Sequence, residues 1–264
     1  MPYTKVNGVR LYYEIAGEGT PLVMAHGLSL DHAMWEPQVA AFSDRYQTIT
    51  YDNRGHGLSE APPQGYSIEV FAEDLYGLLR FLGVERVSLM GLSMGGRIAL
   101  RFVLSHPEMV RALILVDAQS QAPSPEQMSA FAKVAELAEA GKMREAVDHL
   151  YGLPFMSGLS EKRPEWVKRH KAKLVRWSPV GLAWSTRAIM RMASLTDRLQ
   201  EIRVPTLAIV GERDTAYIPF AERYQRTIPQ CKKVVIPGAT HMTNLEEPEL
   251  FNTVLQNFLE GLPS

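Results

Sequence analysis

The sequence predicts an α/β fold built on a mostly parallel, doubly wound β-sheet, with a block of helices inserted into it. Short continuous apolar runs recur along the chain, and segments with helical periodicity fill the gaps between them. Such runs are typical of strands that are covered by helices on both faces. The alternation stops between Asp117 and Val204, where only helical patterns remain, and this predicts the insertion.

The strands are expected in the following order. Alternating residues over 9–15, after the Asn7-Gly8 turn, predict a hairpin with residues 3–6. Apolar runs predict six further strands, at 22–25, 48–51, 87–90, 113–116, 207–210 and 234–236. Short strands separated by helices favour a parallel sheet with right-handed crossovers.

The helices are expected between these strands. Caps and periodicity predict helices over 31–42, 67–82, 94–104 and 245–259. The inserted block predicts four more, over 127–140, 144–150, 165–175 and 181–192. We therefore expect an α/β core made of residues 1–119 and 203–264, and a helical cap made of residues 120–202, at the carboxyl edge of the sheet.

The composition excludes several classes of protein. The 264 residues are 46% hydrophobic and 22% charged, and the net charge of −1 gives no electrostatic footprint for nucleic acid. No apolar run is long enough to cross a membrane, so no membrane partner is expected. Cys231 is the single cysteine, which precludes an internal disulfide and favours a cytoplasmic location. The oligomeric state is left open.

The residues around Ser93 carry the most information about chemistry. The pentapeptide Gly-Leu-Ser-Met-Gly follows the apolar run 87–90 directly and precedes a helix. A serine at such a strand–turn–helix corner projects clear of the sheet, beside the unpaired N–H groups of the helix. Ser93 is therefore the candidate nucleophile.

A serine nucleophile needs a base, and the base works best when a carboxylate orients it. His241 follows the strand expected at 234–236, and Asp214 follows the strand at 207–210. Both belong to loops at the sheet edge that carries Ser93. Their order, Ser then Asp then His, is the order of the nucleophile-elbow hydrolases.

With these residues, the chain resembles the α/β-hydrolase superfamily over essentially its whole length. The Gly-Leu-Ser-Met-Gly-Gly elbow, the stretch 51–59 and the Gly-Ala-Thr-His-Met segment are most similar to enol-lactone hydrolases of aromatic catabolism and their esterase relatives. The resemblance implies that Ser93 is the nucleophile, Asp214 the orienting acid and His241 the base. It also implies an oxyanion hole formed by the backbone N–H groups of Met94 and Leu28.

Other polar residues offer alternatives. Asp117 also ends a strand at the carboxyl edge, so it is the rival of Asp214 for the acid. His26 and His56 are expected to tie backbone groups together in glycine-flanked turns, and Asp52 and Arg54 to brace their own turn. No cluster of His and Cys and no glycine-rich phosphate loop is found, so neither a metal nor another cofactor is expected.

The cap contributes candidate substrate contacts. Its aromatic and methionine side chains are expected either to pack its helices together or to line a pocket. The candidates for the pocket are Phe155, Trp177, Trp184 and Met190.

The function expected from these residues is hydrolysis of small carboxylic esters or lactones, with the small-molecule substrate as the only partner. Three alternatives stay open: hydrolysis of a carbon–carbon bond in a vinylogous diketone, perhydrolysis or cofactor-free haloperoxidase activity, and receptor-like binding without turnover.

Overall fold

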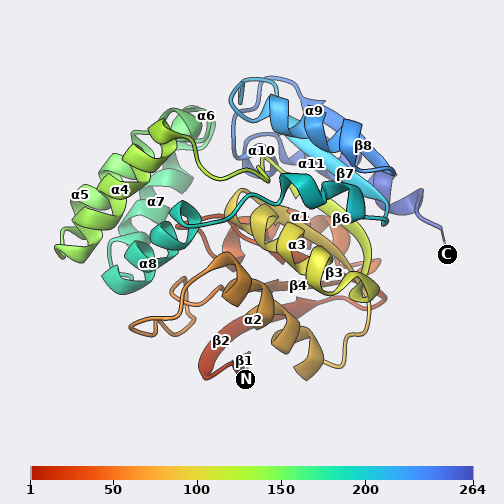
Figure 1. The fold of residues 1–264 in the computed structure, drawn as a ribbon, viewed down its shortest axis with the longest axis horizontal. Helices are drawn as coiled ribbons and strands as arrows, with labels where there is room; N and C mark the ends of the chain where they lie inside the picture. Colours follow the sequence, from red (N-terminus) through yellow and green to blue (C-terminus); the bar gives the residue numbers. More distant parts are fainter. Residues whose placement is uncertain (1, 264) are drawn as a thin grey trace.

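The eight strands form one sheet, in the order β1-β2-β4-β3-β5-β6-β7-β8, in the computed structural model, which describes residues 2–263 (Figure 1). The strands are β1 (Tyr3–Val6), β2 (Val9–Ala16), β3 (Thr20–Ala25), β4 (Tyr46–Tyr51), β5 (Val87–Leu92), β6 (Val110–Val116), β7 (Thr206–Gly211) and β8 (Cys231–Ile236). β2 runs antiparallel to β1 and β4, and every other pair is parallel. All eight expected strands are confirmed.

The register brings the carboxyl ends of five strands to one edge of the sheet. Ala25 of β3 pairs with Gly91 of β5, and Leu92 of β5 pairs with Val116 of β6. Val116 pairs in turn with β7, whose last residue pairs with the last residue of β8. The loops that follow these strands, which hold every residue of the expected catalytic set, therefore start from the same edge.

Helices cover both faces of the sheet. Alternate strand residues divide into two hydrophobic clusters, one on each face. One cluster packs against α2 (Ile68–Phe81) and α3 (Met94–Ser105), and the other against α1 (Glu36–Phe42) and α11 (Pro248–Glu260). The sheet is thus doubly wound, as predicted.

Three helical stretches outside the insertion differ from expectation. The stretch predicted over 31–42 starts as a 3₁₀ turn, His32–Trp35, and is α-helical only from Glu36 in α1. The helix expected over 245–259 is interrupted, because α10 (Thr243–Glu246) ends before Glu247 leaves helical geometry and Pro248 starts α11. Proline suits a first helical position because its missing N–H would be unpaired there anyway. Helix α9 (Ile218–Thr227) was not expected. Two of its ten residues, Ala221 and Tyr224, are buried, and the remaining sequence is so polar that few apolar residues mark the helix.

Five α-helices separate β6 from β7 in the chain and lie to one side of the sheet (Figure 1). They are α4 (Pro125–Glu139), α5 (Met143–Tyr151), α6 (Ser157–Lys162), α7 (Pro164–Leu174) and α8 (Pro179–Met190). The prolines that punctuate this stretch begin α4, α7 and α8. The short helix α6 was not predicted.

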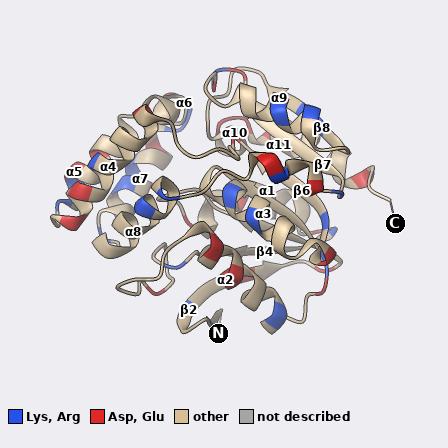
Figure 2. Ribbon diagram, viewed as in Figure 1, with Lys and Arg blue, Asp and Glu red and all other residues tan. Residues whose placement is uncertain are grey.

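Polar contacts attach α6 and α7 to the loops of the sheet. His170 Nε2 hydrogen-bonds the Ser29 carbonyl at 2.8 Å, and the Lys162 ammonium donates to the Gly238 carbonyl at 2.8 Å. Lys173 also pairs with the buried Asp31. Figure 2 shows both signs of charge on the inserted helices as well as on the rest of the molecule. Within residues 2–263, no helix is both long enough and apolar enough to span a membrane.

Candidate active site

Ser93 occupies a strained corner between β5 and α3. Its backbone has φ 53° and ψ −110°, a left-handed conformation that costs a non-glycine residue about 1–3 kcal/mol. Neighbouring glycines permit the bend, since a Cβ on Gly95 would overlap the Ala25 carbonyl and one on Gly91 would overlap the Gly95 backbone. The sequence thus places the Ser93 hydroxyl where β5 meets the amino end of α3.

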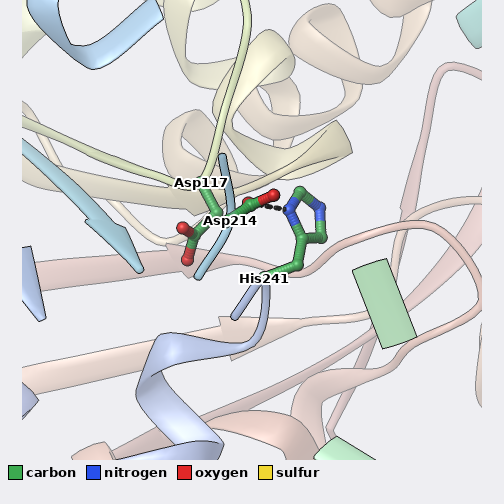
Figure 3. A group of neighbouring side chains, drawn as sticks. All are labelled: Asp117, Asp214 and His241. Carbon is green, nitrogen blue, oxygen red and sulfur yellow. Dashed lines mark hydrogen bonds and ion pairs between the residues drawn. The ribbon is translucent and has the colours of Figure 1, made fainter. Parts of the chain in front are cut away.

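His241 and Asp214 form a buried hydrogen-bonded pair. The imidazole Nδ1 lies 2.6 Å from Asp214 Oδ2, and both side chains are almost fully buried (Figure 3). An N–H on Nδ1 that donates to the carboxylate leaves Nε2 as an acceptor. The rings of Phe155 and Tyr217 pack against the imidazole, with centroids 5.1 and 4.4 Å away. This is the arrangement that a general base requires.

Ser93 and His241 line the same small cavity, which has a volume of about 20 Å³. Among the described residues, no hydrogen bond joins the Ser93 hydroxyl to the imidazole. Catalytic hydrogen bonds are often long or poorly aligned until a substrate is bound. The structure therefore brings the predicted nucleophile and base to one cavity, and joins the base to the predicted acid.

Two backbone N–H groups close to Ser93 have no acceptor. Within residues 2–263, neither the Leu28 N–H nor the Met94 N–H donates a hydrogen bond. Leu28 lines the cavity, and Met94 is the first residue of α3, where N–H groups lack intrahelical partners. Unpaired donors beside a nucleophile are what an oxyanion hole requires.

His26 holds the loop that carries Leu28. Its Nε2 accepts the Asn53 N–H at 3.0 Å, and its Nδ1 donates to the Gly27 carbonyl at 2.8 Å. Burial lowers the pKa of His26, which suits this neutral form. Both ring nitrogens are thus occupied, which confirms the expectation that His26 ties backbone groups together.

Asp117 is fully buried beside the pair, but it does not bond to the imidazole (Figure 3). One of its oxygens accepts the Gly211 N–H at 2.9 Å, and the other accepts the Thr243 hydroxyl at 2.8 Å. Asp117 therefore links the ends of β6 and β7 to α10. Burial, and then the charge of Asp214, raise the pKa of Asp117 well above its ordinary value.

Asp117, Asp214 and His241 also place one potential metal-ligand atom each within 4.8 Å of one another. All three side chains already take part in hydrogen bonding within the protein, Asp117 with the Gly211 N–H and the Thr243 hydroxyl, and Asp214 with the imidazole. The cluster is therefore satisfied without an ion.

Replacing Asp117 with asparagine is expected to flatten the dependence of stability on pH. Because its pKa is raised, Asp117 binds a proton more tightly in the folded state than in the unfolded state, and proton binding therefore stabilises the fold at low pH. This contribution is lost as the pH rises above the ordinary Asp pKa of about 3.9 and through the pKa of the folded state. The difference in Tm, variant minus wild type, should increase from pH 5 to pH 8 in thermal melts. A difference that stays constant across this range would contradict the assignment of a raised pKa.

The contacts that stabilise the turn after β4 agree in part with the roles expected for Asp52, Arg54 and His56. Asp52 accepts the Leu58 N–H at 2.8 Å and so braces its own turn. The expectation for Arg54 was incomplete, because its guanidinium reaches out of the turn and makes two hydrogen bonds of 2.6 Å to Asp74 of α2. His56 is buried and bonds the Arg54 carbonyl at 3.2 Å, which fits the structural role expected for it.

The cavity wall is made by the elbow, its neighbouring loops and the inserted helices. Its residues are Leu28, Ser29, Ser93, Arg97, Phe131, Leu150, Phe155, Met156, Ile189, Tyr217, His241 and Met242. Of the four predicted substrate contacts, Phe155 belongs to this wall. Trp177 packs instead between the rings of His56 and His170, Trp184 lies under the Arg191 guanidinium, and Met190 packs into a hydrophobic cluster.

Phe131, Phe155 and Tyr217 separate this cavity from a larger groove. They line both spaces, and the groove has a volume of about 430 Å³. Phe131, Tyr217 and Arg97 were not among the predicted site residues. For Arg97 a signal existed, because it lies four residues after Ser93, a spacing that places two helical residues on one face.

The chain is similar in sequence and in fold to known hydrolases. A family model for the alpha/beta hydrolase fold matches residues 20–248. The 3-oxoadipate enol-lactonase 1 of Acinetobacter baylyi is 27% identical over 261 residues, which cover 98% of this chain and 96% of that protein. The enol-lactonase from Burkholderia xenovorans LB400 superposes with a TM-score of 0.90 at 31% identity, covering 98% of this chain and all of that one. A thermophilic esterase from Thermogutta terrifontis gives a TM-score of 0.88 at 28% identity, covering 99% and 98%.

Proposed function

This chain belongs to the α/β-hydrolase fold family, and from that premise we propose that it is a serine hydrolase of small carboxylic esters or lactones. The observation that carries the proposal is the buried His241–Asp214 hydrogen bond on the cavity where the strained Ser93 also lies. The names of similar proteins, two enol-lactonases and an esterase, support the substrate class.

The proposed reaction begins with attack of the Ser93 hydroxyl on the carbonyl carbon. Nε2 of His241 takes the hydroxyl proton, and Asp214 stabilises the resulting imidazolium through its bond to Nδ1. Charge that develops on the carbonyl oxygen is stabilised by the Leu28 and Met94 N–H groups, and one such donor is worth about 3–4 kcal/mol in measured cases.

Collapse of this intermediate releases the alcohol and leaves an acyl group on Ser93. The imidazolium of His241 gives its proton to the departing oxygen. Water then attacks the acyl carbon while His241 takes its proton. The bond from the Ser93 oxygen to the acyl group breaks, the carboxylic acid leaves, and His241 returns the proton to that oxygen. The cycle returns every proton and needs no cofactor.

A series of esters with acetyl to octanoyl groups, together with unsubstituted lactones, tests this function. We expect turnover with a burst on an activated acetate ester, and labelling of Ser93 by a fluorophosphonate. We also expect kcat/KM to fall as the acyl chain grows, because a cavity of about 20 Å³ leaves little room beside Ser93. Tight binding without turnover and without labelling would favour a receptor. Cleavage of a vinylogous diketone in preference to every ester would favour carbon–carbon hydrolysis.

A further inference from the structure

Arg97 is a buried cation on the wall of the cavity that holds Ser93 and His241. Its side chain is 2% exposed. Within residues 2–263 only one other Lys or Arg is buried, namely Arg54, and that guanidinium makes two hydrogen bonds of 2.6 Å to Asp74. Arg97 has no carboxylate within ion-pairing distance among the same residues. Nη1 of the guanidinium hydrogen-bonds the Met192 sulfur at 3.5 Å, and the neutral Tyr217 hydroxyl also interacts with the guanidinium.

The protein does not neutralise this charge. Burial lowers the pKa of the Arg97 guanidinium, but arginine remains protonated in proteins near neutral pH. Two phenols near it, those of Tyr217 and Tyr224, are also buried, and burial raises the pKa of Tyr217 to about 12, so that phenol stays neutral. A buried charge without a counterion is unfavourable. A counterion supplied by a ligand would remove this penalty.

We propose that Arg97 binds a carboxylate carried by the substrate, so that the preferred substrates are short anionic esters or lactones. This inference rests on the proposed hydrolase function. Arg97 lies on the first turn of α3, and its N–H donates to the Ser93 carbonyl at 3.1 Å. Its planar guanidinium suits two parallel hydrogen bonds to a carboxylate. The small cavity limits the link between that carboxylate and the scissile carbonyl to a few bonds.

The carboxylate can belong to the acyl group or to the alcohol, and two matched pairs of esters distinguish these sources. Monomethyl succinate and methyl 4-methylpentanoate differ in that a carboxylate replaces an isopropyl group on the acyl side. Acetoxyacetate and isobutyl acetate differ in the same way on the alcohol side. Initial rates in a pH-stat at pH 8 give kcat/KM for each ester.

We expect the wild-type enzyme to prefer the anionic member of at least one pair. Replacing Arg97 with methionine should lower the anionic-to-neutral ratio of kcat/KM for that pair by about 10- to 100-fold, the effect of losing a charge-assisted hydrogen-bonded pair. Arg97→Lys should lower the anionic-to-neutral ratio of kcat/KM less than Arg97→Met does, because lysine keeps the positive charge but cannot form two parallel hydrogen bonds to a carboxylate. The matched control is Arg101→Met, on the next turn of α3 and partly exposed, which should leave the ratio unchanged.

Two results would overturn the inference: a wild-type preference for the neutral member of both pairs, or an unchanged ratio in Arg97→Met. Either can occur while the neutral esters are still cleaved through Ser93, so the proposed function would stand. Failure to cleave any of the four esters, together with no fluorophosphonate labelling, would instead contradict the proposed function.

Ligand binding measured by thermal melting distinguishes loss of the carboxylate site from misfolding of the Arg97→Met variant. In the Ser93→Ala background, acetate or succinate should raise Tm, and the rise should be absent when Arg97→Met is added. The Tm without ligand should not fall in Arg97→Met, because the substitution removes an uncompensated buried charge. An equal rise in Tm with and without Arg97 would contradict a carboxylate site at this residue.

Discussion

Replacing Ser93 with alanine is expected to lower kcat for an activated acetate ester by about 10⁶, as in other serine hydrolases whose nucleophile is removed. The variant keeps the base and the oxyanion donors but has no hydroxyl to form an acyl-enzyme. Steady-state rates on the purified variant measure the effect, and intact mass after fluorophosphonate treatment should show that labelling is lost.

Ser88→Ala is the matched control for this variant. Ser88 lies in β5, five residues before Ser93, and its buried hydroxyl has no hydrogen-bond partner. Alanine at this position should preserve both turnover and labelling. Substantial turnover by Ser93→Ala, with a normal Tm, would contradict the assignment of the nucleophile.

Replacing Asp214 with asparagine is expected to lower kcat by about 10⁴, the size of effect seen when the acid of a serine triad is converted to its amide. The carboxylate accepts the Nδ1–H of His241, whereas an amide that donates to Nδ1 would place the proton on Nε2. Nε2 could then no longer take the proton of Ser93. The measurement is kcat on the same ester between pH 6 and pH 9.

Asp117→Asn provides the comparison, because Asp117 is buried at the same sheet edge and bonds to Gly211 and Thr243. Its amide can keep the bond from the Gly211 N–H, so kcat should fall far less than in Asp214→Asn. A larger loss in Asp117→Asn than in Asp214→Asn would reverse the assignment of the acid.

The sheet and the placement of the candidate site at its edge could be predicted because both depend on local patterns and one topological rule. Each apolar run predicts a strand, and parallel strands bring their carboxyl ends together. The loops of Ser93, Asp214 and His241 were therefore expected at one edge from topology alone. The bond between His241 and Asp214 agrees with that expectation.

The cavity wall could not be predicted in the same way. Phe131 and Phe155 come from the inserted segment and Tyr217 from the loop after β7, so which rings meet at the cavity depends on how the inserted helices lie against that loop. Trp177 and Trp184 have similar side chains but pack elsewhere. The role of Arg54 was missed for a related reason, because its partner Asp74 lies twenty residues away on a different element.

The left-handed backbone of Ser93 has a consequence for how this protein would respond to selection. Folded domains are stable by only about 5–15 kcal/mol, and the conformation of this one residue costs about 1–3 kcal/mol of that margin. A library screened for heat resistance alone would enrich residues that relax this corner, glycine above all, and every one of them lacks the hydroxyl. Substitutions at this position that raise thermal stability therefore abolish turnover, and a screen for heat-resistant variants has to measure activity as well.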